Sequence, residues 1–214
     1  MKVIAINGSP RKNKNTATML EHALVGAKSV GAETELIHLT DLKYSGCVSC
    51  FRCKLKGGKY ANTCAVQDEL SPVLEKIMKS DAVILGSPIY LGEVTGMMRN
   101  LMERLLFMVL TYNKTESSNR STFGGKISAA FIYTMGLTKD RATIYDRLYE
   151  LNDQFLSRLN GRVEHYACMD TYQFDDYSKY DANMFDEKHK SEVRKNQFPL
   201  DCKAAYDIGK RLAS

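Results

Sequence analysis

Apolar and polar residues follow one another along the chain in a pattern that predicts strands alternating with helices. Short, nearly uninterrupted apolar runs, typical of strands covered on both faces, lie at residues 2–8, 34–39, 82–87, 126–134 and 163–170. Apolar residues recur at helical spacing in residues 16–30, 66–80, 96–110, 143–159 and 200–212. This alternation predicts an α/β three-layer sandwich, with a five-stranded parallel sheet of order 2-1-3-4-5 and helices on both faces.

Three loops of this predicted sheet lie where a ligand is expected. In open parallel sheets, ligands bind beyond the carboxyl ends of the strands, at the point where the strand order reverses. The loops that follow Ile6, Gly86 and Tyr133 all end at that edge. We therefore look for binding chemistry in these loops.

The first of these loops, "GSPRKNKNT", places hydroxyl, amide and guanidinium groups directly before a helix. Backbone N–H groups and the dipole at a helix start favour an anion. The loop has neither the spacing of a nucleotide P-loop nor the G-x-G-x-x-G pattern. It predicts a different phosphate cradle, with an ordinary capped turn as the alternative; the candidate donors are Ser9, Arg11, Asn13, Asn15 and Thr16.

The second loop, "GSPIYLGEVTG" at residues 86–96, combines a proline, a tyrosine and glycines after a buried strand. Such a stiff turn presents an aromatic side chain beside exposed backbone, on which a flat ring can lie. Together with a phosphate on the first loop, it predicts a mononucleotide bound edge-on at the sheet. The alternative is that Pro88 and Tyr90 only pack the turn.

The cysteines are unevenly distributed, because four of the six lie in "CVSCFRCKLKGGKYANTC". Cys47, Cys50 and Cys53 follow a C-x2-C-x2-C pattern, and Cys64 follows after ten intervening residues. This spacing lets three thiolates converge on one iron–sulfur cluster, with Cys64 as the fourth ligand. Free or redox-active thiols and a zinc site remain open, although zinc more often uses two separated C-x2-C pairs.

The segments "GSPRKNKNT", "LGSPIYLGEVTGMMRNLMERL" and "CVSCFRC" together resemble the NADPH-dependent FMN reductase and iron–sulfur flavoprotein branch of the flavodoxin-like proteins. The resemblance extends over nearly the whole chain and implies a flavodoxin-like fold that binds FMN. It implies that the phosphate contacts Ser9, Arg11, Asn15 and Thr16. It implies that the isoalloxazine ring lies on Pro88, Ile89, Tyr90, Leu91 and Gly92, with a third contact at Thr134, Met135 and Gly136.

The resemblance also implies a function: an NAD(P)H-dependent FMN reductase-like oxidoreductase that passes electrons to a small-molecule or protein acceptor, such as a flavin, a quinone or an iron–sulfur partner. No catalytic residue is predicted, since the flavin supplies the reactive chemistry. One alternative is an electron-carrier iron–sulfur flavoprotein without its own nicotinamide turnover. A weaker one is a hydrolase of phosphate ligands on the same fold.

The resemblance further implies a [4Fe-4S] cluster on Cys47, Cys50, Cys53 and Cys64. The iron–sulfur flavoproteins begin with the same three cysteines but have a shorter gap before the fourth. The longer gap in this chain is a departure from their pattern, although Gly57 and Gly58 make the excursion flexible.

Composition narrows the class of protein further. The chain has 214 residues, 44% of them hydrophobic, and we expect one domain spanning residues 1–214 with a cysteine-rich loop at 44–66 and a long arm at 170–198. The net charge of +5 is spread without a basic block, so no nucleic-acid partner is predicted. No apolar run approaches about 18 residues, so we expect a cytoplasmic protein without a membrane partner.

The helix at residues 96–110 and the arm at 170–198 bear on assembly. The helix carries more Met, Leu and Phe than one buried face needs, above all at residues 106–110. The arm is long for a connection and rich in aromatic residues. We expect the helix to form a subunit contact, and the arm either to pack on a neighbouring subunit or to cover the site. The family resemblance then implies a homodimer or homotetramer.

Overall fold

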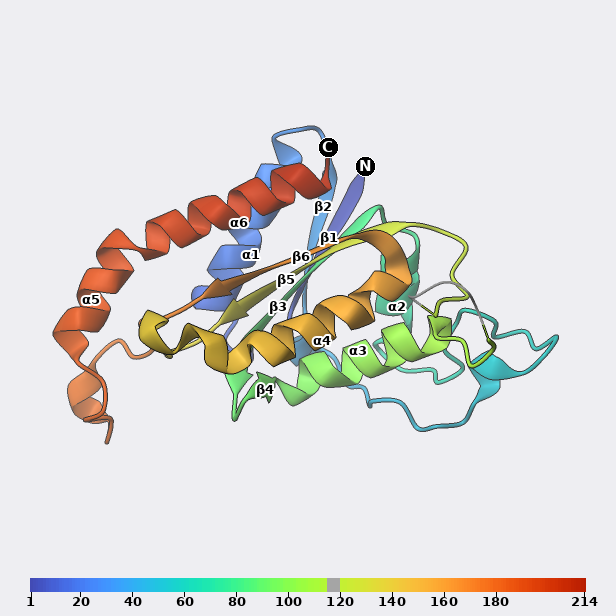
Figure 1. Cartoon of the computed structure of the whole chain (residues 1–214), viewed down its shortest axis with the longest axis horizontal. Coiled ribbons are helices and arrows are strands. Elements are labelled where there is room, and N and C mark those ends of the chain that lie inside the picture. Colours follow the sequence, from blue (N-terminus) through green and yellow to red (C-terminus); the bar gives the residue numbers. More distant parts are fainter. Residues whose placement is uncertain (115–119) are drawn as a thin grey trace.

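The computed structural model describes residues 1–114 and 120–214 and has the predicted α/β architecture (Figure 1). The strands are β1 (Lys2–Asn7), β2 (Glu33–His38), β3 (Ala82–Tyr90), β4 (Glu93–Val94), β5 (Ile127–Thr134) and β6 (Asn160–Cys168). The helices are α1 (Asn15–Lys28), α2 (Ser71–Met78), α3 (Gly96–Val109), α4 (Asp146–Leu156), α5 (Glu187–Asn196) and α6 (Phe198–Leu212).

Five strands form a parallel sheet in the order β2-β1-β3-β5-β6, which confirms the predicted order. The prediction of five strands in all was wrong by one, because β4 pairs antiparallel with the end of β3. A strand of two residues is too short to show any alternation of apolar and polar positions. The missed strand turns the predicted ring-binding loop into a tight hairpin.

The two faces of the sheet carry separate hydrophobic cores. In β1, Val3 and Ala5 point to the face covered by α1 and α6, while Ile4 and Ile6 point to the face covered by α2, α3 and α4. All four side chains are fully buried. Figure 1 shows α1 and α6 on one side of the strands and α3 and α4 on the other. Burial on both faces explains the unbroken apolar runs of the strands.

Helices α1 and α6 approach each other closely at two glycines. A Cβ atom added to Gly209 would lie 1.7 Å from the carbonyl oxygen of Ala23, and one added to Gly26 would lie 1.9 Å from that of Tyr206. Backbone atoms cannot move aside as a flexible side chain would. The contact between the two helices therefore requires glycine on both sides.

Two helices differ from the prediction: one begins later than expected, and one was not predicted at all. Helix α2 begins at Ser71, five residues later than predicted, because the Asp68 carboxylate accepts the Leu70 N–H and Pro72 begins the helix. Helix α5 lies inside the arm, where no helix was predicted. In the described residues, no helix combines the length and apolarity needed to cross a membrane.

Candidate functional site

The ends of β1, β3 and β5 bring the three predicted binding loops to one edge of the sheet. Asn7 lies beside Gly86, and Pro88 lies beside Thr134. The backbone N–H of Gly8 donates to the Gly86 carbonyl at 2.8 Å, so the first two loops are joined directly. The topology therefore places the candidate site residues of all three loops together.

The first loop combines two buried hydroxyl groups with exposed polar side chains. Ser9 and Thr16 are only 5% and 3% exposed. The Ser9 hydroxyl accepts the backbone N–H of Arg11 at 3.1 Å, which fixes the turn. Arg11 and Asn13 are exposed on the loop, and Asn15 is the first residue of α1.

The start of α1 has the character of an anion site. Its N-cap residue, Lys14, makes no side-chain hydrogen bond to the helix, and the first turn contains no acidic residue. The N–H groups of the first turn have no partner within the helix, and the helix dipole adds positive charge there. Arg11 adds positive charge to the loop, whereas Lys12 and Lys14 are paired with Asp41 and Asp175. This donor set fits a phosphate dianion.

The second loop is a hairpin whose tip points to solvent. Leu91 and Gly92 both have positive φ angles, 51° and 86°, as in the two-residue turns that suit a β-hairpin. Leu91 is fully exposed and Tyr90 half exposed, whereas Pro88 and Ile89 are partly buried in β3. A leucine in the left-handed region costs about 1 kcal/mol or more. A strained, exposed apolar turn at this edge offers a surface for a flat ring.

Thr95 and Ser87, which the sequence reasoning missed, hold the first two loops together. The Thr95 hydroxyl donates to the Gly8 carbonyl at 2.7 Å and accepts the N–H of Met98, so it also caps α3. The Ser87 hydroxyl accepts the Thr95 N–H at 3.0 Å. A threonine directly before an apolar helix was the available signal for the cap, but its bond to Gly8 could not be read from the sequence.

The third loop contacts the first through a pair of buried hydroxyl groups. Thr16 and Thr134 share a hydrogen bond of 2.8 Å between their Oγ1 atoms. Met135 is buried and contributes to the core below the loop. The carbonyl of Gly136 accepts a hydrogen bond from Lys190 at 2.7 Å. The third loop is thus tied both to the phosphate loop and to α5.

The arm, which we expected either to pack on a neighbouring subunit or to cover the site, lies against the first loop. Arg11 donates to the Gln173 carbonyl at 2.7 Å, and Asn15 donates to the Tyr172 carbonyl at 2.9 Å. Arg194 of α5 donates to the Asn15 side-chain oxygen at 3.0 Å. The aromatic content of the arm indicated packing, but nothing in the pattern identified the partner.

A buried ion pair holds the arm in this position. Lys190 is 2% exposed and pairs with Asp170, which also contacts His189 at 2.6 Å. Burial raises the pKa of Asp170, but hydrogen bonds from Lys190 and then His189 outweigh it and hold that pKa below its ordinary value. The carboxylate therefore stays charged and keeps α5 docked beside Gly136.

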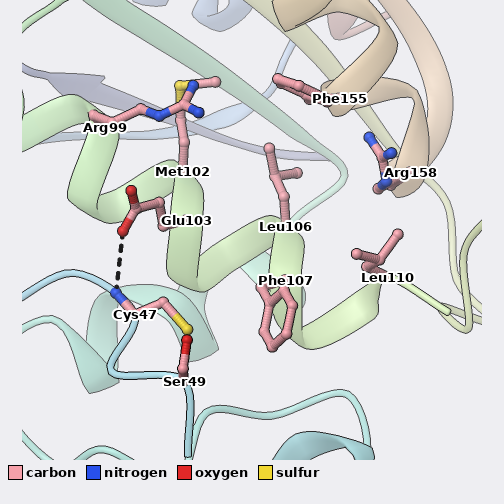
Figure 2. A pocket seen from close by; sticks show the side chains of 10 residues that line it. All are labelled: Cys47, Ser49, Arg99, Met102, Glu103, Leu106, Phe107, Leu110, Phe155 and Arg158. Atoms are coloured by element: carbon pink, nitrogen blue, oxygen red, sulfur yellow. Dashed lines mark hydrogen bonds between the residues drawn. The ribbon is translucent and has the colours of Figure 1, made fainter. Parts of the chain in front are cut away.

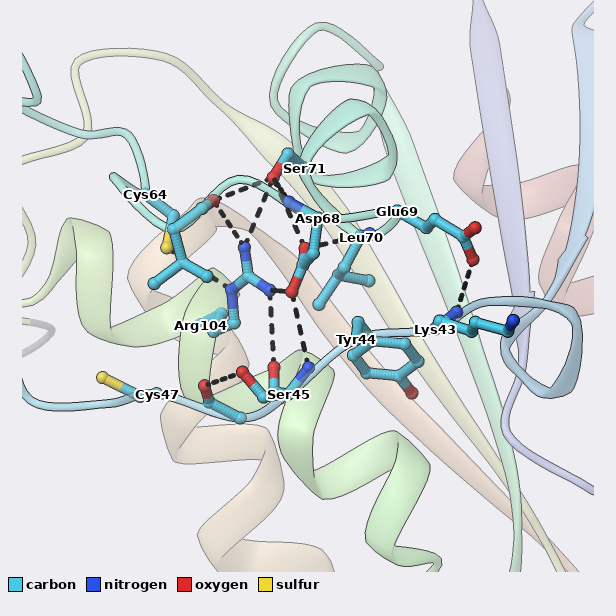
Figure 3. Close-up of polar contacts among 12 residues, drawn as sticks. Lys43, Tyr44, Ser45, Cys47, Cys64, Asp68, Glu69, Leu70, Ser71 and Arg104 are labelled. Atoms are coloured by element: carbon cyan, nitrogen blue, oxygen red, sulfur yellow. Dashed lines mark hydrogen bonds and ion pairs between the residues drawn. The ribbon is translucent and has the colours of Figure 1, made fainter.

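The cysteine loop is fastened to α3 by one buried arginine (Figure 3). Arg104 is 1% exposed and contacts Asp68 at 2.5 Å. Its guanidinium also donates to the Ser45 carbonyl at 3.4 Å, the Val66 carbonyl at 3.0 Å and the Cys64 sulfur at 3.4 Å. One side chain thus joins both ends of the loop to the helix.

Lys54 fastens the middle of the same loop. Its ammonium group donates to the carbonyls of Phe107, Met108 and Leu110 at the carboxyl end of α3, where a cation complements the helix dipole. Burial lowers the pKa of Lys54, while the neighbouring Cys53 and Cys47 raise it. Cations from Arg104 and Lys54 therefore lie close to the thiols.

The four clustered cysteines line a single cavity of about 20 Å³, which has room for about one water molecule. Cys53 and Cys64 both pack against the core, and burial raises the pKa of the Cys53 thiol. Four cysteine thiols are the type of ligand that an iron–sulfur cluster uses, and the neighbouring cations would favour their thiolate forms. In the described part of the chain, however, no group of three or more potential ligands is arranged to hold a metal ion. The donors are present, but the ligand set is not assembled.

The apolar excess of α3 has a different explanation from the one predicted. Leu106 and Met108, which we assigned to a subunit contact, are 7% and 3% exposed and belong to the core. The cysteine loop covers a second side of α3, where Phe51 contacts Phe107 edge-to-face at 5.7 Å. The helix is apolar on more than one side because two parts of the same chain pack against it.

The three loops thus combine a phosphate-type donor set, an exposed turn and a buried third contact, and these residues fit FMN. A sequence model of the family described as NADPH-dependent FMN reductase matches residues 1–147. The chain belongs to this family. The predicted class of protein, an oxidoreductase of the flavin reductase type, agrees with this assignment. The match ends before the arm, so the arm itself lies outside the matched residues.

Curated relatives of this FMN reductase family member include iron–sulfur flavoproteins. One from Archaeoglobus fulgidus is 43% identical over 104 residues, which are 49% of this chain and 48% of the relative. One from Clostridioides difficile is 27% identical over 198 residues, with coverage of 81% and 86%. The chain spans about half the length of several curated relatives that it matches.

Solved structures agree on the fold. The NAD(P)H:quinone oxidoreductase from Methanothermobacter marburgensis superposes with a TM-score of 0.69 at 14% identity, covering 100% of this chain and 98% of that one. At this identity the likeness concerns the fold alone. It supports the flavodoxin-like arrangement of sheet and helices.

Proposed function

We propose that this chain binds FMN at the edge formed by β1, β3 and β5, takes electrons from NAD(P)H and passes them to a small-molecule or protein acceptor such as a flavin or a quinone. The observation that carries the proposal is the convergence of three loops on the uncapped start of α1. Bound FMN would supply the hydride and electron chemistry. The residues of the chain itself would bind the cofactor and orient its ring.

Each group of residues has a role in this proposal. Ser9, Arg11, Asn15 and Thr16, with Asn13 at the loop tip, would hold the phosphate. Pro88, Ile89, Tyr90, Leu91 and Gly92 would support the ring, and Thr134, Met135 and Gly136 would close its other edge. The exposure of Tyr90 and Leu91 leaves this turn open to a partner molecule.

Changing Arg11 and Thr16 together to Ala tests the cradle. Loss of one charge-assisted and one neutral hydrogen bond should weaken FMN binding by about 2–4 kcal/mol, or roughly 30- to 1,000-fold. The measurement is fluorescence titration of the apoprotein, with Arg147→Ala on the exposed side of α4 as the control. A double variant that binds FMN as tightly as the parent would place the phosphate elsewhere.

Nicotinamide turnover distinguishes the proposed enzyme from an electron carrier. The FMN-loaded protein should oxidise NADPH or NADH in steady state when free FMN or a quinone is supplied. Flavin that binds tightly and accepts electrons only from a reduced protein partner would support the carrier alternative. A chain that binds no flavin would favour the hydrolase alternative.

We also propose a [4Fe-4S] cluster on Cys47, Cys50, Cys53 and Cys64. The common cavity of these cysteines and the nearby Arg104 support it; closing the ligand set requires the loop to rearrange. Protein purified without oxygen should contain about four irons and four sulfides per chain. Cys64→Ser should lose them while retaining FMN, whereas Cys202→Ser in α6 should keep both.

If anaerobic protein shows only flavin absorption and all clustered thiols titrate freely, the cluster proposal is wrong.

We further propose that residues 1–214 act as one domain and assemble as a homodimer or homotetramer. Sedimentation equilibrium across a range of protein concentrations measures the assembly. A monomer at all concentrations would contradict it.

A further inference from the structure

A second cavity, separate from the flavin edge, lies between α3, the end of α4 and the cysteine loop (Figure 2). Its volume is about 380 Å³, within the range of small-molecule sites. Its walls are largely apolar and aromatic, with side chains from Met102, Leu106, Phe107, Leu110 and Phe155. The cavity is therefore suited to a flat apolar molecule.

Two arginines give the same cavity a positive charge. The guanidinium carbon of Arg99 lies 5.9 Å from the ring centre of Phe155, and that of Arg158 lies 5.2 Å from it. Figure 2 shows the two arginines on opposite sides of the Phe155 ring. Both cations are within the range of attraction to the ring face, so they are held at the cavity wall.

Neither arginine makes an ion pair with a carboxylate within residues 1–114 and 120–214. Arg158 donates to the Gln154 carbonyl at 3.2 Å. Burial and then the neighbouring Arg120 lower the pKa of Arg158, which indicates crowding of positive charge. Glu103 is the acidic residue of the lining, and its carboxylate accepts the backbone N–H of Cys47 at 3.3 Å. The arginines keep their capacity to bind an anion.

We propose that this cavity is a binding site for a small aromatic carboxylate. The ring of the ligand lies against Phe107 and Leu106, and its carboxylate contacts one of the two guanidinium groups at the cavity wall, that of Arg99 or that of Arg158. Charge complementarity selects the anion, and the aromatic walls select a flat body over an aliphatic one. None of the lining residues belongs to the three loops at the sheet edge, whereas Cys47 and Ser49 of the cysteine loop form part of the wall.

Isothermal titration calorimetry of the full chain with 2-naphthoate tests the proposal. The parent should bind it, and 2-naphthol, which has the same rings without the carboxylate, should bind at least tenfold more weakly. The double variant Arg99→Gln with Arg158→Gln should lose at least tenfold in affinity for 2-naphthoate. Arg141→Gln, a change at an exposed arginine outside the cavity, should bind like the parent.

Three results would overturn the proposal. The first is a parent that does not bind 2-naphthoate, or that binds it with an affinity indifferent to both cavity arginines while circular dichroism shows intact variants. The second is competition between 2-naphthoate and FMN, which would place the ligand at the flavin edge. The third is a parent that self-associates through this face, with the double variant monomeric and no naphthoate bound, which would make the cavity a contact between copies.

Discussion

Replacing Arg104 with Met should release the cysteine loop from α3. Methionine retains the length and the apolar stem but removes the charge and every hydrogen bond of the guanidinium. Removing one partner of a buried ion pair costs about 3–5 kcal/mol. Asp68 is 17% exposed and keeps the hydrogen bond from Leu70, so we expect a loss near the lower end, about 3 kcal/mol.

The assay is thermal and urea unfolding, monitored by circular dichroism. For a chain of this size, about 3 kcal/mol corresponds to a fall in Tm of roughly 6–12 °C. The clustered thiols should also react faster with a thiol reagent, at denaturant concentrations where the sheet is intact. Arg104→Lys, which keeps the charge without the planar fork, should recover only part of the loss.

The pH dependence gives an independent check on the same pair. Burial raises the pKa of Asp68, but the hydrogen bond and charge of Arg104 outweigh it and hold that pKa below its ordinary value. The stabilisation is therefore present above about pH 4, the unfolded value, and is lost as the pH falls through the folded value. The free energy of unfolding of the Met variant should therefore fall less steeply than that of the parent as the pH is lowered below about 4. A change below about 1 kcal/mol at pH 7, with thiol reactivity unaltered, would refute the role assigned to Arg104.

Two further predictions concern the sheet and its helices. Gly209→Ala should lower Tm strongly because the added Cβ meets the backbone of α1, whereas Gly124→Ala, where nothing lies within 4 Å, should not; equal effects in calorimetry would contradict the close contact. The hydrogen bond that His165 donates to the Asp153 carboxylate raises the pKa of His165 against its burial, so this stabilisation is complete below about pH 6.5 and is lost as the pH rises through the folded value. Asp153→Asn should therefore flatten the stability profile on the alkaline side of pH 6.5, and an unchanged profile would argue against the pair.

The sheet order and the convergence of the loops could be predicted from the sequence because both follow from simple physical rules. Strands buried on both faces must be apolar throughout, and right-handed crossovers leave few arrangements of five such strands. The edge where strand order reverses then follows from topology. Ser9, Tyr90 and Thr134 reach one edge for this reason, without any knowledge of side-chain contacts.

The arm and the buried arginine could not be predicted, because tertiary contacts decide both. Helix α5 has almost no apolar residue, so no periodicity marks it; the Asp186 cap and the Lys190 pair hold it in place. Arg104 stands in an apolar helix, where a cation normally faces solvent. Only the fold shows that the cysteine loop encloses it. Ion pairs between distant segments leave no local pattern.

Helix α3 sets a fixed spacing between the proposed FMN-binding edge and the cysteine loop. Its cap, Thr95, is bonded to Gly8 at the phosphate loop, and Arg104, nine residues later, holds both ends of the cysteine loop. At 1.5 Å per residue, the two anchor points are about 14 Å apart along the helix axis. A buried helix bends little, so neither site can approach the other within one chain without breaking an anchor. Electron exchange between them inside a single chain would have to cross a gap of constant length.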